Sequence, residues 1–175
     1  MTLPDSLHGP SQPARSGNTR KLVILLHGLG ADGNDLFGLA DELADALPDA
    51  AFVSPNAPFP CDMAPYGYQW FSLQSRDEED MLRGISLAAP VLNGFIDEHL
   101  ERLNLKPSCV ALVGFSQGTM MSLYTALRRA EPVAGIVGFS GALIAPQLMA
   151  TEMKSTPPVC LIHGTADPVV PFQAM

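Results

Sequence analysis

Residues 114–118, Gly-Phe-Ser-Gln-Gly, combine a hydroxyl nucleophile with two flanking glycines. The apolar run 109–113 before them predicts a buried strand, and residues 119–130 after them carry apolar side chains at helical spacing. A serine in so sharp a strand-to-helix turn must adopt a strained backbone, and small neighbours leave room for it. The pattern predicts that Ser116 lies above a sheet, at the start of a helix, where a base can reach its hydroxyl.

A second segment could stabilise the charge that such a nucleophile creates. An apolar run ends in His-Gly-Leu-Gly at residues 27–30. Attack on an acyl carbon puts negative charge on the carbonyl oxygen, which preorganised backbone N–H groups stabilise. Gly28 and Gly30 would let the chain turn so that the Leu29 N–H points into the site. Gln117, directly after the serine, would supply the second N–H. The alternative is that residues 27–30 are simply the end of a strand.

A third segment offers an acid. The apolar run 159–162 predicts a strand, and the loop after it carries Asp167. An aspartate at that place would hold an imidazole in the correct tautomer and stabilise its protonated form. Serine followed by aspartate is one of the orders in which the residues of catalytic triads occur along a chain. The alternative is that Asp167 is a turn residue, because aspartates are common in loops.

These motifs together resemble the phospholipase/carboxylesterase branch of the α/β-hydrolases, which includes acyl-protein thioesterases and bacterial carboxylesterases. The resemblance covers about residues 21–171, and its matching segments are 27–35, 55–58, 70–72, 114–118 and 163–167. It implies an α/β fold: a mostly parallel sheet with helices on both faces, a nucleophile elbow and an oxyanion hole. It also implies a serine hydrolase that cleaves carboxylic esters or thioesters through an acyl-enzyme. Such an enzyme, of carboxylesterase, lysophospholipase or acyl-protein thioesterase type, needs neither cofactor nor metal.

Two aromatic residues in the long loop 61–76 have two interpretations. Trp70 and Phe71 either fill the core or, as the resemblance implies, line the acyl pocket together with Gly28 and Gly30. The sequence leaves the two interpretations open. In either case the expected partner is a small ester or thioester molecule.

The sequence departs from the family at the catalytic base. Family members carry the triad histidine a few tens of residues beyond the aspartate, whereas this sequence ends at Met175. None of its four histidines fits that position: His8, His27, His99 and His163. We expect His8 to be mobile, His27 and His163 to be structural, and His99 to lie roughly 20 Å from Ser116.

The expectation is therefore a triad without its histidine. The domain would be incomplete at its C-terminus and would lack the last strand and helix of the fold. The alternative function is a non-catalytic remnant or binding module that keeps the hydrolase pocket. Without a following strand, residues 159–162 would form an open sheet edge, through which two copies of the chain could pair as a homodimer.

The composition narrows the class of protein. A net charge of −8 argues against nucleic-acid partners and against stable association with anionic membranes. The three cysteines show no metal-ligand spacing, and two of them, Cys109 and Cys160, fall in predicted core strands. An odd number of cysteines and the lack of a signal sequence favour a reducing cytoplasm.

The sequence predicts a single domain preceded by a leader. Residues 1–20 are expected to be a flexible leader, and 21–175 the α/β-hydrolase domain. Helices are predicted over 35–47 and 78–104, the second with Pro90 starting, kinking or splitting it. Further strands are predicted over 21–27, 50–54 and 133–139, and strands that alternate with helices indicate a parallel sheet.

Overall fold

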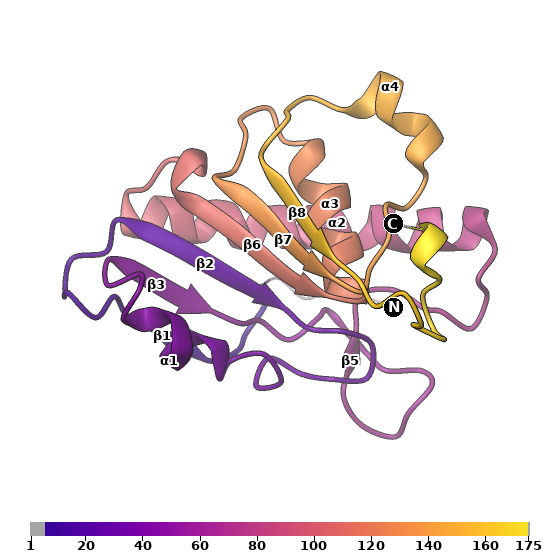
Figure 1. Ribbon diagram of the computed structural model, residues 1–175, viewed down its shortest axis with the longest axis horizontal. Helices are drawn as coiled ribbons and strands as arrows, with labels where there is room; N and C mark the ends of the chain where they lie inside the picture. The colour runs from indigo at the N-terminus through magenta and orange to yellow at the C-terminus, as the bar shows by residue number, and fades with distance from the viewer. Residues whose placement is uncertain (1–5, 175) are drawn as a thin grey trace.

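The computed structural model describes residues 6–174 and shows a six-stranded sheet in the order β1-β3-β2-β6-β7-β8 (Figure 1). Its strands are β1 (Ser11–Gln12), β2 (Lys21–Leu26), β3 (Ala50–Val53), β6 (Val110–Phe115), β7 (Gly135–Phe139) and β8 (Val159–Ile162). Only β1 runs antiparallel to its neighbour. A separate two-stranded sheet pairs β4 (Phe59–Pro60) with β5 (Tyr68–Gln69). The mostly parallel sheet that the sequence predicts is confirmed.

Helices cover both faces of the sheet, as expected. They are α1 (Leu39–Ala44), α2 (Glu78–Leu103), α3 (Gln117–Leu127) and α4 (Met149–Glu152), with short 3₁₀ turns η1 (Pro107–Cys109), η2 (Pro146–Leu148) and η3 (Phe172–Ala174). Alternate residues of β2 enter opposite cores, because successive strand side chains point to opposite faces. Leu22 and Ile24 pack in the larger core with α2 and α3, whereas Val23 and Leu25 pack with Ala40 of α1.

Of the two predicted helices, the first is shorter in the structure and the second is confirmed. The predicted helix 35–47 narrows to α1, because successive i→i−3 hydrogen bonds, such as Phe37 N–H to Asn34 O, form turns before it. The helix α2 runs as one element through Pro90, which therefore neither starts nor splits it.

The N-terminal segment is a correction to the sequence prediction of a flexible leader. Residues 6–20 pack along the sheet, and β1 pairs with β3. The Ser54 N–H donates to Pro10 O (3.0 Å), and the Asn56 N–H donates to His8 O (2.8 Å). The His8 backbone is therefore hydrogen-bonded to the segment after β3, in contrast to the mobile position that the sequence predicts. Residues 1–5 of the predicted leader lie outside the described residues.

At the other edge of the sheet, β8 pairs only with β7 among residues 6–174. Leu161 packs against the larger core, whereas Val159 and Ile162 are 45 % and 48 % exposed. The prediction that Cys160 lies in the core is wrong, because this side of β8 has no helix of the described chain over it and the thiol is exposed. Within residues 6–174, no helix has the length and the apolar character needed to cross a membrane.

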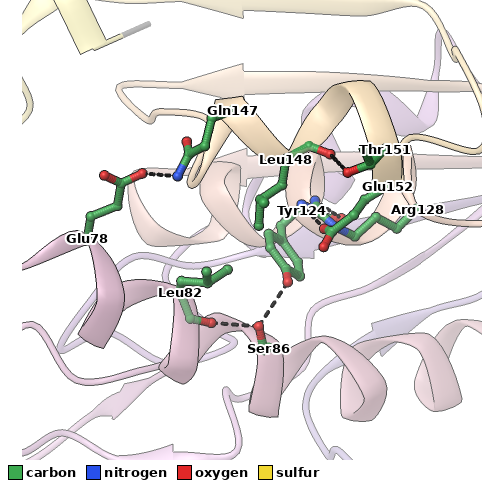
Figure 2. A network of polar contacts seen from close by, with 9 residues as sticks. All are labelled: Glu78, Leu82, Ser86, Tyr124, Arg128, Gln147, Leu148, Thr151 and Glu152. Carbon is green, nitrogen blue, oxygen red and sulfur yellow. Dashed lines mark hydrogen bonds and ion pairs between the residues drawn. The ribbon is translucent and has the colours of Figure 1, made fainter.

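The connection from β7 to β8 passes over α2 and α3 and is fixed to both (Figure 2). Gln147 of η2 donates to the Glu78 carboxylate at the start of α2. Arg128, just after α3, donates from Nε to Glu152 of α4 (2.8 Å), and its guanidinium stacks 3.6 Å from the Tyr124 ring centroid. These contacts fix the connection just after residues 142–146. Those residues line cavities beside the ends of the strands, and Ala142 and Ile144 share one of these cavities with Ser116.

Candidate active site

Ser116 occupies the sharp turn between β6 and α3, and its backbone is strained. Its φ of 51° and ψ of −113° lie in a region that residues other than glycine rarely adopt. The Ser116 N–H donates to Phe139 O of the neighbouring strand (2.8 Å), which fixes the turn. A Cβ on Gly114 would lie 2.5 Å from Gly118 backbone, and one on Gly118 would lie 1.9 Å from Leu26 O. Both flanking positions therefore require glycine.

Residues 27–30 lie directly beside this serine. A Cβ on Gly28 would lie 3.4 Å from the Ser116 Cβ, and Gly30 turns the chain at a φ of 78°. Among the described residues, no protein acceptor is hydrogen-bonded to the backbone N–H of Leu29 or of Gln117. The Gln117 N–H is at the first position of α3, where helices leave N–H groups unpaired and carry positive partial charge. Two free donors thus flank the serine.

His27 is fully buried and both ring nitrogens are engaged. Its Nε2 accepts the Ala57 N–H (3.0 Å), so Nδ1 carries the proton and donates to Gly28 O (2.7 Å). Burial lowers the pKa of His27, since the charged form would lose its hydration. The neutral imidazole shapes the loop 27–30, as the sequence predicts for a structural histidine.

Two cavities meet at Ser116. The larger, of about 540 Å³, is bounded at Ser116 by Gly28 and Leu29. Its other walls are mainly apolar and include Met63, Leu73, Met81, Met120, Ala142, Ile144 and Val170, with Arg76 and Asp35 as its charged residues. The second cavity, of about 450 Å³, is lined by Ser116, Phe115, Ser140, Gly164 and residues 167–170. Both cavities are mainly apolar, and the second one brings the Asp167 carboxylate and the Ser140 hydroxyl to the same space as Ser116.

Asp167 lines the second cavity together with Ser116. Its Oδ1 accepts the N–H groups of Val169 (2.8 Å) and Val170 (3.0 Å). These backbone hydrogen bonds hold the pKa of Asp167 below its ordinary value of 3.8, with a smaller contribution from the Ser140 hydroxyl. The carboxylate is therefore ionised at neutral pH, and its Oδ2 remains for another donor.

Ser140 belongs to this group of residues, and the sequence analysis missed it. It follows β7 with a φ of 47°, and its N–H donates to Ile162 O (2.9 Å). The signal in the sequence is the small pair Ser140-Gly141 directly after an apolar strand. A Cβ on Gly141 would lie 2.8 Å from Ser116 O, so the chain passes close to the turn at Ser116 there.

The histidines are all described, and none lines either cavity at Ser116. The His163 side chain is buried, and its Nε2 donates to Val170 O (2.8 Å) while lying 3.9 Å from Asp167 Oδ2. His8 and His99 line a different, smaller cavity beside residues 53–55. Within residues 6–174, no group of three or more His, Cys, Asp or Glu side chains is placed to hold a metal ion.

Trp70 and Phe71 fill the core, which is the first of their two interpretations. Both are fully buried in the larger hydrophobic core, and neither is among the residues that line the two cavities at Ser116. The prediction that Gly30 lines the pocket is wrong as well, because the lining from this loop comes from Gly28, Leu29 and Ala31. The apolar lining comes mainly from methionines and small aliphatic residues of several elements, whose contact no local sequence motif predicts.

Comparison with known proteins agrees with this geometry. The family model described as Phospholipase/Carboxylesterase matches residues 12–175. The crystal structure of esterase PE8 is similar with a TM-score of 0.93 and 46 % identity, covering 97 % of this chain and 80 % of that one.

Curated relatives give the same result at lower identity. Acyl-protein thioesterase 1 of Schizosaccharomyces pombe is 33 % identical over 85 % of this chain and 69 % of its own length. Esterase YpfH of Escherichia coli is 28 % identical over 94 % of this chain and 67 % of its own length. A strained serine between two glycines, the apolar cavity beside it and these matches lead to one conclusion: the chain belongs to the phospholipase/carboxylesterase family of carboxylic ester hydrolases.

Proposed function

We propose that the protein hydrolyses carboxylic esters or thioesters through an acyl-enzyme on Ser116. The observation that carries this proposal is the strained φ of Ser116 at the junction of two cavities, with the Leu29 and Gln117 N–H groups free beside it. Strain of this kind persists at sites where a side chain must be held in one place. Names of relatives, acyl-protein thioesterase and esterase, support both ester and thioester substrates.

In the proposed reaction, the Ser116 hydroxyl oxygen bonds to the acyl carbon while a base takes its proton. The negative charge that forms on the carbonyl oxygen is held by the Leu29 and Gln117 N–H groups. The alcohol or thiol then leaves with the proton, and water attacks the acyl-enzyme to release a carboxylic acid. The apolar cavity of about 540 Å³ takes the acyl chain.

The base in this proposal is an imidazole held between Ser116 and Asp167. Both residues line the second cavity, and Oδ2 of Asp167, which lies 3.9 Å from His163 Nε2, offers an acceptor for an imidazole N–H. The histidines at positions 8, 27, 99 and 163 are engaged elsewhere, so the imidazole must come from outside this set. Without a base, the two oxyanion donors leave a rate about 10³–10⁴-fold above water.

The direct test is rescue by free imidazole. The rate of p-nitrophenyl acetate hydrolysis is measured with and without imidazole, and the rate of Ser116→Ala under the same conditions is subtracted, since imidazole cleaves this ester unaided. We expect a Ser116-dependent rate that rises about tenfold or more with imidazole. 1-Methylimidazole, of similar basicity but without an N–H for Asp167, should rescue far less. Equal rates in the parent and Ser116→Ala at every concentration would refute the mechanism.

A second candidate function follows from the positions of the histidines. A binding module would keep the apolar cavity and take up an acyl chain without turnover. It would bind a fatty acyl ligand in a titration, and Ser116→Ala would bind equally well. Labelling of Ser116 by a fluorophosphonate, detected by mass spectrometry, would argue against this candidate.

The proposal includes a cytoplasmic location for the protein. The cysteines at positions 61, 109 and 160 are free thiols, which supports a reducing environment such as the cytoplasm. Acidic net charge also supports small-molecule substrates over nucleic acids and anionic lipid surfaces.

A further inference from the structure

The side chain of Gln117 makes two hydrogen bonds to the backbone of a distant segment. It is fully buried, and its Oε1 accepts the Trp70 N–H (2.9 Å) while its Nε2 donates to Phe71 O (2.7 Å). The first residue of α3 is therefore attached at two points to a segment 46 and 47 positions earlier in the chain. Two opposed hydrogen bonds fix both the position and the rotation of the amide.

The same segment holds the loop that carries Leu29. The Trp70 indole Nε1–H donates to His27 O (3.1 Å). Tyr68 accepts the Gly30 N–H (2.8 Å), and its own N–H donates to Ala31 O (2.8 Å). The loop is thus held just before and just after Leu29, while the Leu29 N–H itself stays free.

Burial makes these contacts specific. Trp70, Gln117 and His27 have no exposed surface. In such a low-dielectric interior, hydrogen bonds are strong and an unpaired donor or acceptor is costly. The three side chains therefore have few alternative positions that keep their hydrogen bonds. Gly67 allows residues 67 and 30 to approach closely, since a Cβ on Gly67 would lie 2.1 Å from Gly30 O.

We propose that residues 68–71 act as a spacer that sets the distance between the two oxyanion-hole donors, with the Trp70 indole and the Gln117 amide as positioning residues. This inference rests on the proposed function, because it needs Leu29 and Gln117 as the donors. Oxyanion stabilisation depends on donors that are in place before charge develops. The donors sit in the loop after β2 and at the start of α3, and the spacer links the two through contacts outside the cavities at Ser116.

The test compares Trp70→Phe with Phe71→Leu. Trp70→Phe removes the indole N–H but keeps an aromatic ring, whereas Phe71→Leu reduces an equally buried side chain and keeps every hydrogen bond of the spacer. The measurement is the rate at which a fluorophosphonate phosphonylates Ser116: the Oγ–P bond forms, the P–F bond breaks, and fluoride and the hydroxyl proton go to solvent. Urea unfolding establishes that each variant is folded under the assay conditions.

We expect Trp70→Phe to slow labelling about tenfold and Phe71→Leu to leave the rate within about twofold, because a displaced donor weakens only the charged transition state. Gln117→Glu, which keeps the acceptor for the Trp70 N–H but loses the donor to Phe71 O, should also slow labelling. If Trp70→Phe and Phe71→Leu label equally fast, the spacer is ordinary core packing and the inference fails. If the parent chain is not labelled at Ser116 even when free imidazole is present, the proposed function itself has failed.

A measurement on the unaltered chain tests the proposal even if the variants do not fold. Trp70 is the only tryptophan, so its indole N–H gives a single NMR resonance. A boronic acid that forms a tetrahedral adduct on Ser116 should shift this resonance, although the indole does not line the cavity. An unchanged resonance at full adduct formation would overturn the proposal.

Discussion

At the scale of single residues, the candidate site contains two side chains held in unusual states. Ser116 is kept at positive φ by the fit of its glycine neighbours, and Asp167 is kept ionised by two backbone N–H groups. The positive φ of a serine costs free energy in isolation, and the surrounding fold maintains it. The hydrogen bonds from the two N–H groups stabilise the charged form of the carboxyl.

The lowered pKa of Asp167 predicts a pH-dependent contribution to stability. A carboxyl whose pKa is lower in the folded chain stabilises the fold above its ordinary value of 3.8, and this stabilisation is lost as the pH falls through the folded pKa. Asp167→Asn should therefore lower the free energy of unfolding at pH 7, and the difference from the parent should be smaller at pH 3, which lies below that ordinary value. Urea denaturation at both pH values measures this.

Asp62→Asn serves as the control for that experiment, because it removes the same charge from an exposed loop residue. A difference between the parent and Asp167→Asn that is the same at pH 7 and at pH 3 would show that the charge is not stabilised by these N–H groups.

At the scale of elements, the sharp turn at Ser116 depends on α3 packing directly on the end of β2. Gly118 is the contact point, since only a residue without a Cβ allows the approach to Leu26 O. By contrast, Gly94 of α2 is exposed and would meet nothing within 4 Å if it carried a Cβ. The two glycines therefore predict opposite effects of the same substitution.

We expect Gly118→Ala to destabilise the chain by several kcal/mol or to prevent folding, because the added Cβ would clash with the backbone of Leu26 and His27. Gly94→Ala should raise the free energy of unfolding by about 0.5–1 kcal/mol, since alanine favours the helix and restricts the unfolded chain. Chemical denaturation of both variants checks this. A stable, well-folded Gly118→Ala protein would mean that α3 can move away from β2.

At the scale of the whole molecule, the two edges of the sheet differ. The leader covers β3 through β1, whereas β8 leaves an edge with unpaired N–H and C=O groups in the described chain. The exposed Val159 and Ile162 make this edge apolar, and it lacks the lysines and bulges that prevent strand pairing.

The 175-residue chain should consequently self-associate through β8 at micromolar concentration, as a dimer or larger species. Cys160→Lys places a charge on the exposed side of the strand and should reduce association, whereas Leu161→Lys should unfold the chain because Leu161 packs on the core. Sedimentation velocity distinguishes these outcomes. A parent chain that stays monomeric would show that the β8 edge does not recruit a second copy.

The sequence alone determined the elements and the chemistry that is local. Gly-Phe-Ser-Gln-Gly after an apolar run fixed the strand–turn–helix, since backbone sterics act over a few residues, and the alternation of apolar residues and helices gave the parallel sheet. Tertiary structure decided what depends on contacts between distant segments: the leader as an edge strand, Trp70 in the core, and the methionine-lined cavity. It also decided the bridge from Gln117 to Trp70 and on to His27, because hydrogen bonds across 43 to 47 positions leave no local pattern in a sequence.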